Sequence, residues 1–330
     1  MNHLDNSIGG SPPFEYTSPS NQHNFMRTMF TALLYFAAAA GAFAQANPAT
    51  HTQVVILGTG TPVPNPDRSG PSVAVVVNNS AYLVDFGPGV VRRAAAAARD
   101  KHIEALRVPN LKIAFATHLH SDHTAGLSDL FLTPAVMDRD APLELYGPPG
   151  LSDMAKHIEA AYVKDIDVRV HGLEHEDPVA YKIKAHEIKP GRIYQDANVT
   201  VTAFPVAHGS WDYSYGYRFD TADRSIVISG DTGPTENVAK ACHGCDLMLY
   251  EVYSVKWFEQ QPLARQKYHS AFHTSTTTLA AMATKGKPAQ LVLYHQLFLP
   301  SDNPDTVLLN EMRTAGYRGL VASAHDLDVF

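Results

Sequence analysis

Short apolar segments rich in β-branched residues recur along the chain and alternate with segments of helical pattern. Runs of about four to eight such residues, bounded by Gly, Pro, Asn or Asp, are typical of strands. We predict strands that begin near Val54, Val73, Tyr82, Ile113, Leu143, Val199, Ser225, Leu247 and Leu291. Ala-, Leu- and charge-containing segments predict helices over 90–106, 151–163, 235–241, 275–285 and 305–315. Because several strands are apolar on both faces, we expect two sheets packed together with helices outside.

Composition favours one large domain. The chain has 330 residues and a formal net charge of -7. No Ser/Gly-rich spacer, charge block or repeat occurs between Gln53 and Phe330, so we predict a single domain over 45–330. Lys and Arg are scattered apart from Arg92-Arg93. We therefore expect a small-molecule substrate and no nucleic acid as a partner; a homodimer is compatible with the sequence.

The N-terminal segment has the features of a secretory signal. Arg27 precedes the run TMFTALLYFAAAAGAFA, whose end 42–44 is a small-x-small cleavage site. We predict a signal peptide over 26–44 and a periplasmic or secreted mature protein with no stable membrane association. A membrane anchor is the alternative, because the Ala-rich run is marginal in length for a span. Residues 1–25 are polar and contain Pro and Ser, so we expect a disordered or non-native leader, with Met26 as the alternative start.

Two cysteines occur, Cys242 and Cys245, in the segment ACHGCD. Their spacing allows a local disulfide, a redox pair or two half-buried thiols. Asp246 follows the second cysteine, which excludes haem attachment, and one pair is too few for a zinc ribbon. The sequence keeps the three interpretations open.

Histidines and an aspartate follow the strand predicted at Ile113. The segment LKIAFATHLHSDHTAGL places His118, His120, Asp122 and His123 directly after it. Residues two apart at a strand end point the same way, and His123 joins them where the chain turns into a helix that we expect over 122–134. Imidazoles and a carboxylate are ligands that zinc and similar metals take. The segment predicts a metal site, in outline a dinuclear one, since a helix cap would explain Asp122 but not three histidines.

The segment THLHSDHTAGL resembles the metal-binding signature of the metallo-β-lactamase superfamily. Five further segments resemble most closely the ribonuclease Z and periplasmic arylsulfatase branch: QVVILGTGTPVPNPDRSGPS, YLVDFGPG, LYGPPG, GYRF and ISGDT. The resemblance extends from Gln53 to Phe330. It implies an α/β (α+β) fold of four layers, the αββα sandwich.

The resemblance also implies a ligand set for two metal ions. His208 follows the predicted strand VTVTAFPVA, Asp231 follows SIVIS and His295 ends LVLY, positions at which side chains reach a sheet edge. By resemblance, the first ion is held by His118, His120 and His208, the second by Asp122, His123 and His295, and Asp231 bridges them. We expect two Zn²⁺ per chain, with Mn²⁺ or iron as alternatives. Asp85 suits a bracing role better than a ligand role.

The expected chemistry is ester hydrolysis by a metal-bridging hydroxide. Asp122 would orient the hydroxide, and the leaving group needs a proton. The family's Glu-bearing strand end and His-Ser-Thr loop are matched by YEVY around Glu251 and by the loop that begins at His273, so His273 is the candidate proton donor. The match departs from the family at Tyr250, which replaces the usual His, and in the exchange of Thr and Ser. His269 is a rival candidate.

The interval between His208 and Asp231 is short, and its basic residues are Arg218 and Arg224. Ribonuclease Z-type enzymes carry a long RNA-gripping arm in this interval. We therefore predict an exported hydrolase of small-molecule esters, above all aryl sulfates or phosphodiesters, including cyclic nucleotides. The alternatives are a ribonuclease Z-type nuclease, a lactonase, a β-lactamase or a non-catalytic metal-stabilised binding protein. The nearby aromatic residues, Trp211, Tyr213, Tyr215, Trp257 and Phe258, either line an aryl-binding pocket or belong to the core.

Overall fold

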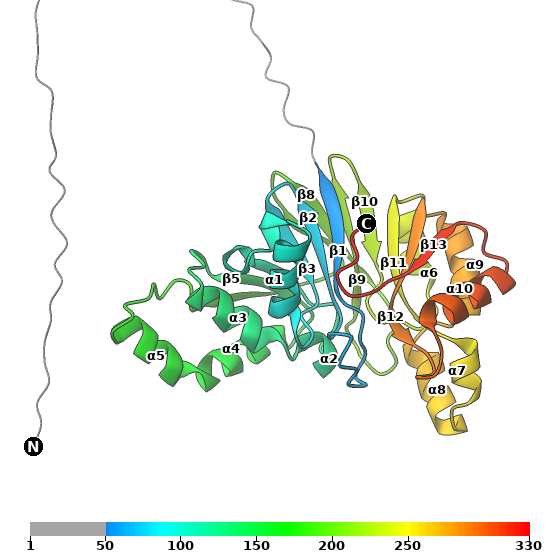
Figure 1. The fold of residues 1–330 in the computed structure, drawn as a ribbon, viewed down its shortest axis with the longest axis horizontal. Coiled ribbons are helices and arrows are strands. Elements are labelled where there is room, and N and C mark those ends of the chain that lie inside the picture. The colour runs from blue at the N-terminus through cyan, green and yellow to red at the C-terminus, as the bar shows by residue number, and fades with distance from the viewer. Residues whose placement is uncertain (1–50) are drawn as a thin grey trace, which may run out of the picture. The chain divides into compact units, whose positions relative to one another are not determined.

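The computed structural model describes residues 51–330, and two β-sheets form its centre (Figure 1). The first sheet contains β1 (Thr52–Gly58), β2 (Ser72–Val77), β3 (Ser80–Val84), β4 (Ile113–Phe115), β5 (Leu143–Gly147) and β6 (Ile183–Glu187), in that order. The second contains β13 (Leu320–Ser323), β12 (Gln290–Leu297), β11 (Leu247–Tyr253), β10 (Ser225–Ile228), β9 (Tyr215–Thr221), β8 (Val199–Pro205) and β7 (Gly191–Gln195). The predicted leader 1–25 and signal peptide 26–44 lie outside the described residues.

Both sheets are mixed. Strands β3 to β6 pair in parallel, whereas β1, β2 and β3 pair antiparallel. In the second sheet β7 to β10 pair antiparallel and β10 to β13 pair in parallel. The parallel strands of each sheet therefore end at one edge, where loops can assemble a site.

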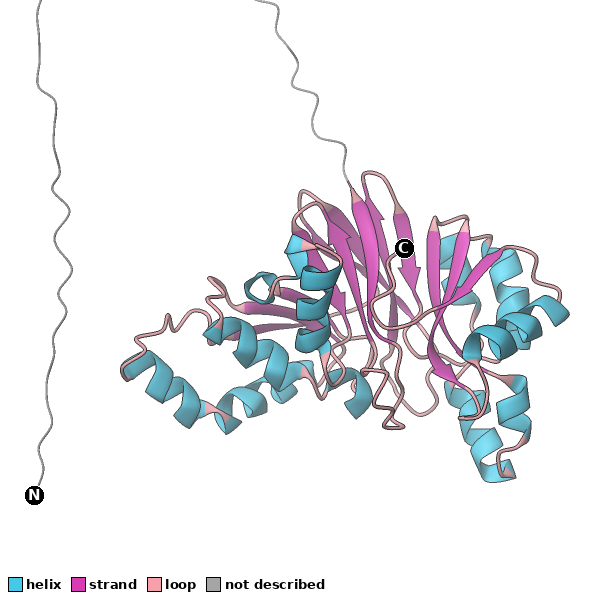
Figure 2. Cartoon of the chain, viewed as in Figure 1, coloured by secondary structure: helices cyan, strands magenta, loops and turns pink. Residues whose placement is uncertain are grey.

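Helices cover the outer faces of both sheets (Figure 2). The α-helices are α1 (Val90–Asp100), α2 (Ser121–Thr124), α3 (Leu127–Val136), α4 (Leu151–Ala161), α5 (Val163–His171), α6 (Glu236–Cys242), α7 (Val255–Glu259), α8 (Leu263–Phe272), α9 (Thr276–Gly286) and α10 (Pro304–Thr314). Two 3₁₀-helices, η1 (Glu104–Leu106) and η2 (Val108–Asn110), follow α1.

The alternation of side chains along each strand explains the layers. In β2, Val73 and Val75 pack in the core between the sheets, while Ala74 and Val76 pack against the helices of the first sheet. In β12, Val292 faces the inner core and its neighbours face α6, α9 and α10. Burial of each such aliphatic side chain contributes about 1.5–3 kcal/mol, so both faces of both sheets hold the fold together. The predicted αββα sandwich is confirmed.

Some boundaries differ from the prediction. The helix expected over 90–106 ends at Asp100 and continues as the 3₁₀ turn η1. The helix expected over 122–134 is two helices, α2 and α3, separated at Gly126. A side chain at Gly126 would lie 2.5 Å from the carbonyl oxygen of Gly87, so the break lets two backbones approach closely.

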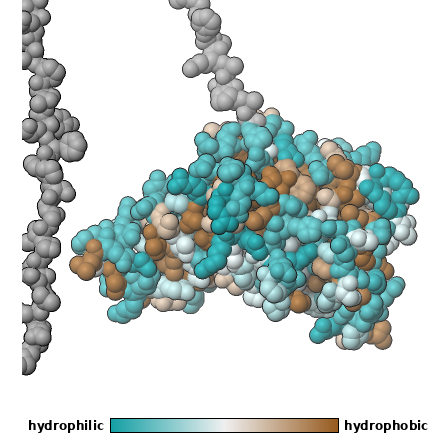
Figure 3. Space-filling view, in the orientation of Figure 1, coloured by the Kyte–Doolittle hydropathy of each residue, from teal (hydrophilic) through white to brown (hydrophobic). Residues whose placement is uncertain are grey.

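Two helical hairpins project from the sandwich, α4–α5 beside the first sheet and α7–α8 beside the second (Figure 1). No residue of α5 is buried, and Val163, Val168 and Leu173 are exposed near its ends. Apolar colour at the outer end of this hairpin is visible in Figure 3. No helix within residues 51–330 is long and apolar enough to span a bilayer.

Cys242 and Cys245 form a buried disulfide with an S–S distance of 2.02 Å, at the end of α6. Of the three interpretations left open by the sequence, the structure agrees with the local disulfide. The bridge joins the end of α6 to the segment that enters β11.

Candidate metal centre

The seven predicted ligands come from residues 118–123 and from three single positions further along the chain, and they meet at one edge of the sandwich. They are His118 and His120 in the loop after β4, Asp122 and His123 in α2, His208 after β8, Asp231 after β10 and His295 in β12. Most of them therefore follow the ends of strands. The structure brings all seven together, and their role as ligands stays a prediction.

His295 reaches this edge through a β-bulge. The pairing of β11 with β12 shifts by one residue, so that Glu251 pairs with Tyr294 and Val252 pairs with Gln296. His295 is the extra residue and has a positive φ of 44°. A bulge bends the strand and re-aims one side chain, which here is the imidazole.

Three imidazole nitrogens converge in one group. The Nε2 atoms of His118 and His208 lie 3.0 and 3.1 Å from Nδ1 of His120. These three rings are suited to hold one metal ion through these nitrogens.

Asp122, His123, Asp231 and His295 form a second group. Nε2 of His295 lies 3.3 Å from both Oδ2 of Asp122 and Oδ2 of Asp231. Nε2 of His123 lies 3.4 Å from Oδ2 of Asp231 and 3.6 Å from Oδ2 of Asp122. Asp231 also lies within reach of His118, so it stands between the two groups.

The donor set fits a divalent cation. Among the described residues, Nε2 of His123 and Oδ1 of Asp231 are buried and have no hydrogen-bond partner. A buried polar atom without a partner costs about 1–3 kcal/mol, and coordination to a cation would remove that cost. Imidazole nitrogen and carboxylate oxygen are common zinc ligands, and their number suffices for two ions.

Burial and charge set the protonation of the site. Burial lowers the pKa of His118 well below its usual value, with the charge of His123 as the second cause, and it lowers the pKa of His208 to about 4. These rings are neutral at pH 7, the state that binds a metal. Burial alone would raise the pKa of Asp231, but His295 and His123 hold it well below its usual value.

The carboxylates make the second group attractive to cations. Burial alone would lower the pKa of His123, but Asp231 and Asp85 raise it well above its usual value. The same two negative charges would favour a divalent ion at Nε2, which would displace a proton from that nitrogen.

The other nitrogen of several rings is fixed by a hydrogen bond. Nδ1 of His123 donates to Oδ2 of Asp85 over 2.8 Å, and the Thr117 backbone N–H and hydroxyl also donate to Asp85. Nδ1 of His118 lies 3.0 Å from the hydroxyl oxygen of Thr117, and Nδ1 of His208 donates to the Phe272 carbonyl over 2.8 Å. Such contacts leave Nε2 of these rings with a lone pair that faces the centre. Asp85 thus braces a predicted ligand.

His273 and Glu251 lie beside the second group. Nδ1 of His273 is 3.2 Å from Oε2 of Glu251 and 3.9 Å from Oδ2 of Asp231, and the Thr274 N–H donates to Oε1 of Glu251 over 2.8 Å. Burial raises the pKa of Glu251 well above its usual value, with the charge of Asp231 as the second cause. Burial lowers the pKa of His273 to about 4.

The rival histidine lies further away. The ring of His269 is centred 5.7 Å from that of His273 and 4.7 Å from that of Trp257. Within the described part of the chain, His269 joins none of the metal-competent groups, whereas His273 groups with Asp231 and His295.

Two contacts of the site were not predicted from the sequence. The Phe272 contact to His208 is made by a backbone carbonyl, which no side-chain pattern reveals. Trp211 donates from its indole N–H to Nε2 of His120 over 2.8 Å. The only sequence signal for that contact was the presence of Trp211 three residues after His208.

Comparison with known proteins agrees with this geometry. Residues 81–296 match the family model described as beta-lactamase superfamily domain. Ribonuclease Z of Mycobacterium bovis is 32% identical over 256 residues, which cover 76% of this chain and 88% of the relative. Ribonuclease Z of Mycobacterium sp. strain KMS is 34% identical over 248 residues, which cover 74% and 84%.

Solved structures share the fold. YhfI from Bacillus subtilis has a TM-score of 0.64 at 16% identity, over 84% of this chain and 98% of that chain. The short form of human tRNase Z has a TM-score of 0.60 at 23% identity, with the same two coverages. The fold and the His/Asp site define a metal-dependent hydrolase of ester bonds, as predicted. The chain belongs to the metallo-β-lactamase superfamily, in the branch that includes ribonuclease Z.

The prediction that nucleic acid is not a partner is wrong. The relatives that cover three quarters of the chain are named ribonuclease Z. The prediction relied on scattered Lys and Arg and on the short interval between His208 and Asp231. A short interval excludes only an RNA-binding arm inserted at that position. The charge of the whole chain does not show which Lys or Arg side chains near the site are free to contact phosphate.

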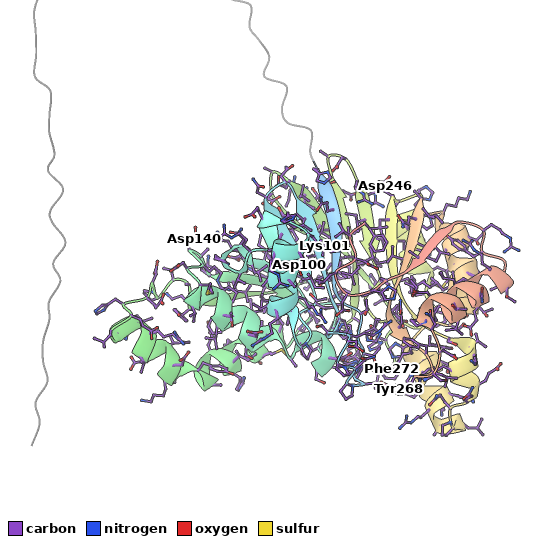
Figure 4. The ribbon with its side chains drawn as sticks, viewed as in Figure 1. Asp100, Lys101, Asp140, Asp246, Tyr268 and Phe272 are labelled. Atoms are coloured by element: carbon purple, nitrogen blue, oxygen red, sulfur yellow. A yellow bond between two sulfur atoms is a disulfide. The ribbon has the colours of Figure 1, made fainter. Side chains whose placement is uncertain are left out.

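Loss of the Asp85 charge should weaken metal binding without unfolding the protein. We expect Asp85→Asn to lower zinc affinity by about 10- to 100-fold, because His123 loses the carboxylate that orients it. Competition with a chromophoric chelator, with elemental analysis, measures this. Asp246→Asn is the matched control, since Asp246 lies at the opposite end of the second sheet from α8 (Figure 4) and binds Ser225. Equal zinc affinity in Asp85→Asn and Asp246→Asn would contradict the bracing role.

Proposed function

We propose that the chain is a dinuclear metal-dependent phosphodiesterase that hydrolyses RNA. The observation that carries the proposal is a complete set of seven His/Asp donors in a chain about a third identical to proteins named ribonuclease Z. His118, His120 and His208 would hold one ion, Asp122, His123 and His295 the other, with Asp231 between them. When bound, two divalent ions activate water and neutralise charge on the phosphate.

The reaction exchanges one P–O bond for another. The oxygen of water joins phosphorus, and the bond from phosphorus to the leaving hydroxyl oxygen breaks. One proton of water is released, and the leaving oxygen takes up a proton to become an alcohol. Asp122, which is nearly buried beside His295, would accept a hydrogen bond from the attacking water and orient it.

His273 is the proposed donor of the proton to the leaving oxygen. Burial lowers its pKa to about 4 in the free site, and the negative charge of a bound phosphodiester would raise that pKa and favour the protonated ring. His273 is nearly buried, lies 3.9 Å from Asp231 and contacts Glu251, whose carboxyl group is also held by the Thr274 N–H. Glu251 would fix the orientation of the ring, as the third group of a catalytic triad does. This arrangement puts a titratable ring next to the site without adding it to the seven ligands.

A cavity of about 770 Å³ adjoins Asp122 and offers a place for the substrate. It is lined by residues 61–66 and 68–70, and also by Pro88, Gly89, Ser121 and Ala125. Arg68 donates to Gln296 over 3.0 Å and lies over the ring of Phe298. The charges of Asp326 and Asp305 act on it from a distance, and it forms no ion pair within residues 51–330. Arg68 would therefore be available to a phosphate oxygen.

Small phosphodiesters or aryl sulfates are the second candidate substrates. The interval from His208 to Asp231 contains the β9 and β10 hairpin and no inserted helix or strand. Because no inserted element in this interval extends over the site, the site would be open to compact esters as well as to the end of an RNA chain.

We also propose that the protein is exported. The segment 26–44 has the composition of a signal peptide, and a buried disulfide at Cys242 and Cys245 suits an oxidising compartment. An exported enzyme would meet RNA outside the cytoplasm.

Substrate choice tests the proposed function. Zinc-loaded protein is expected to shorten an RNA with a 3′ extension and to hydrolyse bis(4-nitrophenyl) phosphate, because both present a phosphodiester to the same site. Gel analysis of the RNA and absorbance of nitrophenol are the measurements. Turnover of 4-nitrophenyl sulfate with neither phosphodiester would replace the proposal by a sulfatase.

Removal of His273 tests proton donation. We expect His273→Ala to keep its metal and to slow turnover by about 10²- to 10⁴-fold, with a smaller loss on acidic leaving groups that depart without a proton. Elemental analysis and kinetics over a series of substituted phenyl esters measure this. His269→Ala is the matched control, expected to have near-normal rates. Metal loss in His273→Ala, or equal defects across the series, would contradict the assignment.

Sequencing of the mature N-terminus tests export. Protein from the native cell envelope or medium should begin at Gln45, because the small residues before it fit signal peptidase. An uncleaved chain in the membrane fraction would indicate an anchor, and one in the cytoplasm would reject export.

A further inference from the structure

Aromatic side chains form a rim beside the histidines of the first group, and the proposed mechanism does not use them. We call Trp211, Tyr213, Tyr268 and Phe272 the aromatic rim. Trp211 and Tyr213 lie between β8 and β9, and the other two lie on α8. Trp211, Tyr213 and Tyr268 are 36%, 51% and 43% exposed, so the rim is not part of the core. Exposed aromatic surface beside a site is typical of ligand contact.

Trp211 meets the imidazoles with its edge. Its ring centre lies 5.1 Å from that of His120 at an interplanar angle of 87°, and 6.1 Å from that of His118 at 76°. The indole N–H lies on this edge and donates to Nε2 of His120. Neither imidazole therefore covers a face of the indole.

Tyr268 and Phe272 supply a second aromatic surface. They are one helical turn apart on α8, where Figure 4 labels them, and their rings stack with centres 4.3 Å apart. The ring of Phe272 also lies 4.9 Å from that of His208, edge to face. Phe272 approaches so closely that a side chain at Gly209 would overlap its ring. Rings from two separate elements thus adjoin the first group of histidines: Trp211 lies beside His118 and His120, and Phe272 lies beside His120 and His208.

Metal binding at His120 would free the indole N–H. A neutral imidazole has one proton, so an ion on Nδ1 leaves that proton on Nε2. Indole can only donate a hydrogen bond, and Nε2 would then no longer accept one. Trp211 would present an unpaired donor and a partly exposed ring beside the site.

We propose that Trp211 is the stacking platform for the nucleobase next to the cleaved phosphate, with Tyr268 as a second wall. This inference rests on the proposed phosphodiester hydrolysis and extends it from the phosphate to the base. Every base has an aromatic face, so stacking provides affinity with little sequence preference. Such contacts suit a chain whose Lys and Arg are scattered, because rings replace part of the phosphate contact that a basic surface would make.

Two esters with the same leaving group separate stacking from chemistry. They are thymidine 5′-(4-nitrophenyl phosphate) and methyl 4-nitrophenyl phosphate, which differ in the nucleoside. In zinc-loaded full-length protein, Trp211→Ala should lower kcat/KM for the nucleoside ester by about 10- to 100-fold and leave the methyl ester nearly unchanged. Trp211→Phe should retain most of the preference. Tyr162→Ala, a 38% exposed aromatic beside α5, is the control expected to change neither ester.

Equal loss on both esters in Trp211→Ala would indicate a structural role and overturn the proposal. A fluorescence measurement decides it even if neither ester is hydrolysed, an outcome that would reject the proposed function instead. The chain has two tryptophans, so Trp257→Phe leaves Trp211 as the sole one. With zinc bound, thymidine 5′-monophosphate should quench its emission and methyl phosphate should not. Unchanged emission with the nucleotide would overturn the stacking role.

Discussion

The site depends on the burial of imidazoles and carboxylates where strands of both sheets end. Burial of such groups costs free energy unless they are hydrogen-bonded, paired with an opposite charge or bound to a metal ion. Here the rings of His118, His123 and His208 are each bound at Nδ1 by a hydroxyl, a carboxylate or a carbonyl oxygen. Those bonds determine which nitrogen faces inward, so the second layer of contacts selects the atoms that are free to bind a metal.

Close backbone packing holds this arrangement in place. A side chain at Gly87 would lie 2.4 Å from the carbonyl oxygen of Asp122, and Gly126 is equally confined against Gly87. The short helix α2 is therefore seated directly on the loop after β3. The bulge at His295 adds the last side chain from the other sheet. The glycines lack side chains and the bulge interrupts regular strand pairing, and each of these features places a predicted ligand.

Sequence patterns predicted the most apolar strands and the clustered histidines, and missed strands in which polar residues interrupt the apolar pattern as well as helices whose residues are exposed. Strands such as β2 and β12 are apolar at almost every position, and all of these were found. Three missed strands lie at sheet edges: β6 is the polar segment IKAHE, β7 has no fully buried residue, and β13 has only four residues. The fourth, β9, is central, and its sequence YGYRFDT was missed because Arg218 and Asp220 interrupt the apolar run. The helix α5 has no buried residue, so it lacks an apolar stripe that would predict it. At the site, side-chain ligands carry a spacing signal, whereas the Phe272 carbonyl and the bulge depend on tertiary packing.

The pairing of each cation is more informative about RNA contact than the charge of the whole chain. On the projecting α4–α5 hairpin, Arg169 pairs with Asp165 and Glu174 at 3.2 and 2.8 Å, and Lys156 pairs with Asp153. These cations are neutralised by their own neighbours and would have to break an ion pair to bind phosphate. Arg68 has an amide and an aromatic ring as neighbours instead, and it lines the cavity beside Asp122. A net negative charge is therefore compatible with the proposed binding of a phosphodiester, to which the Arg68 guanidinium and two metal ions would contribute, because the field that matters at the site is local.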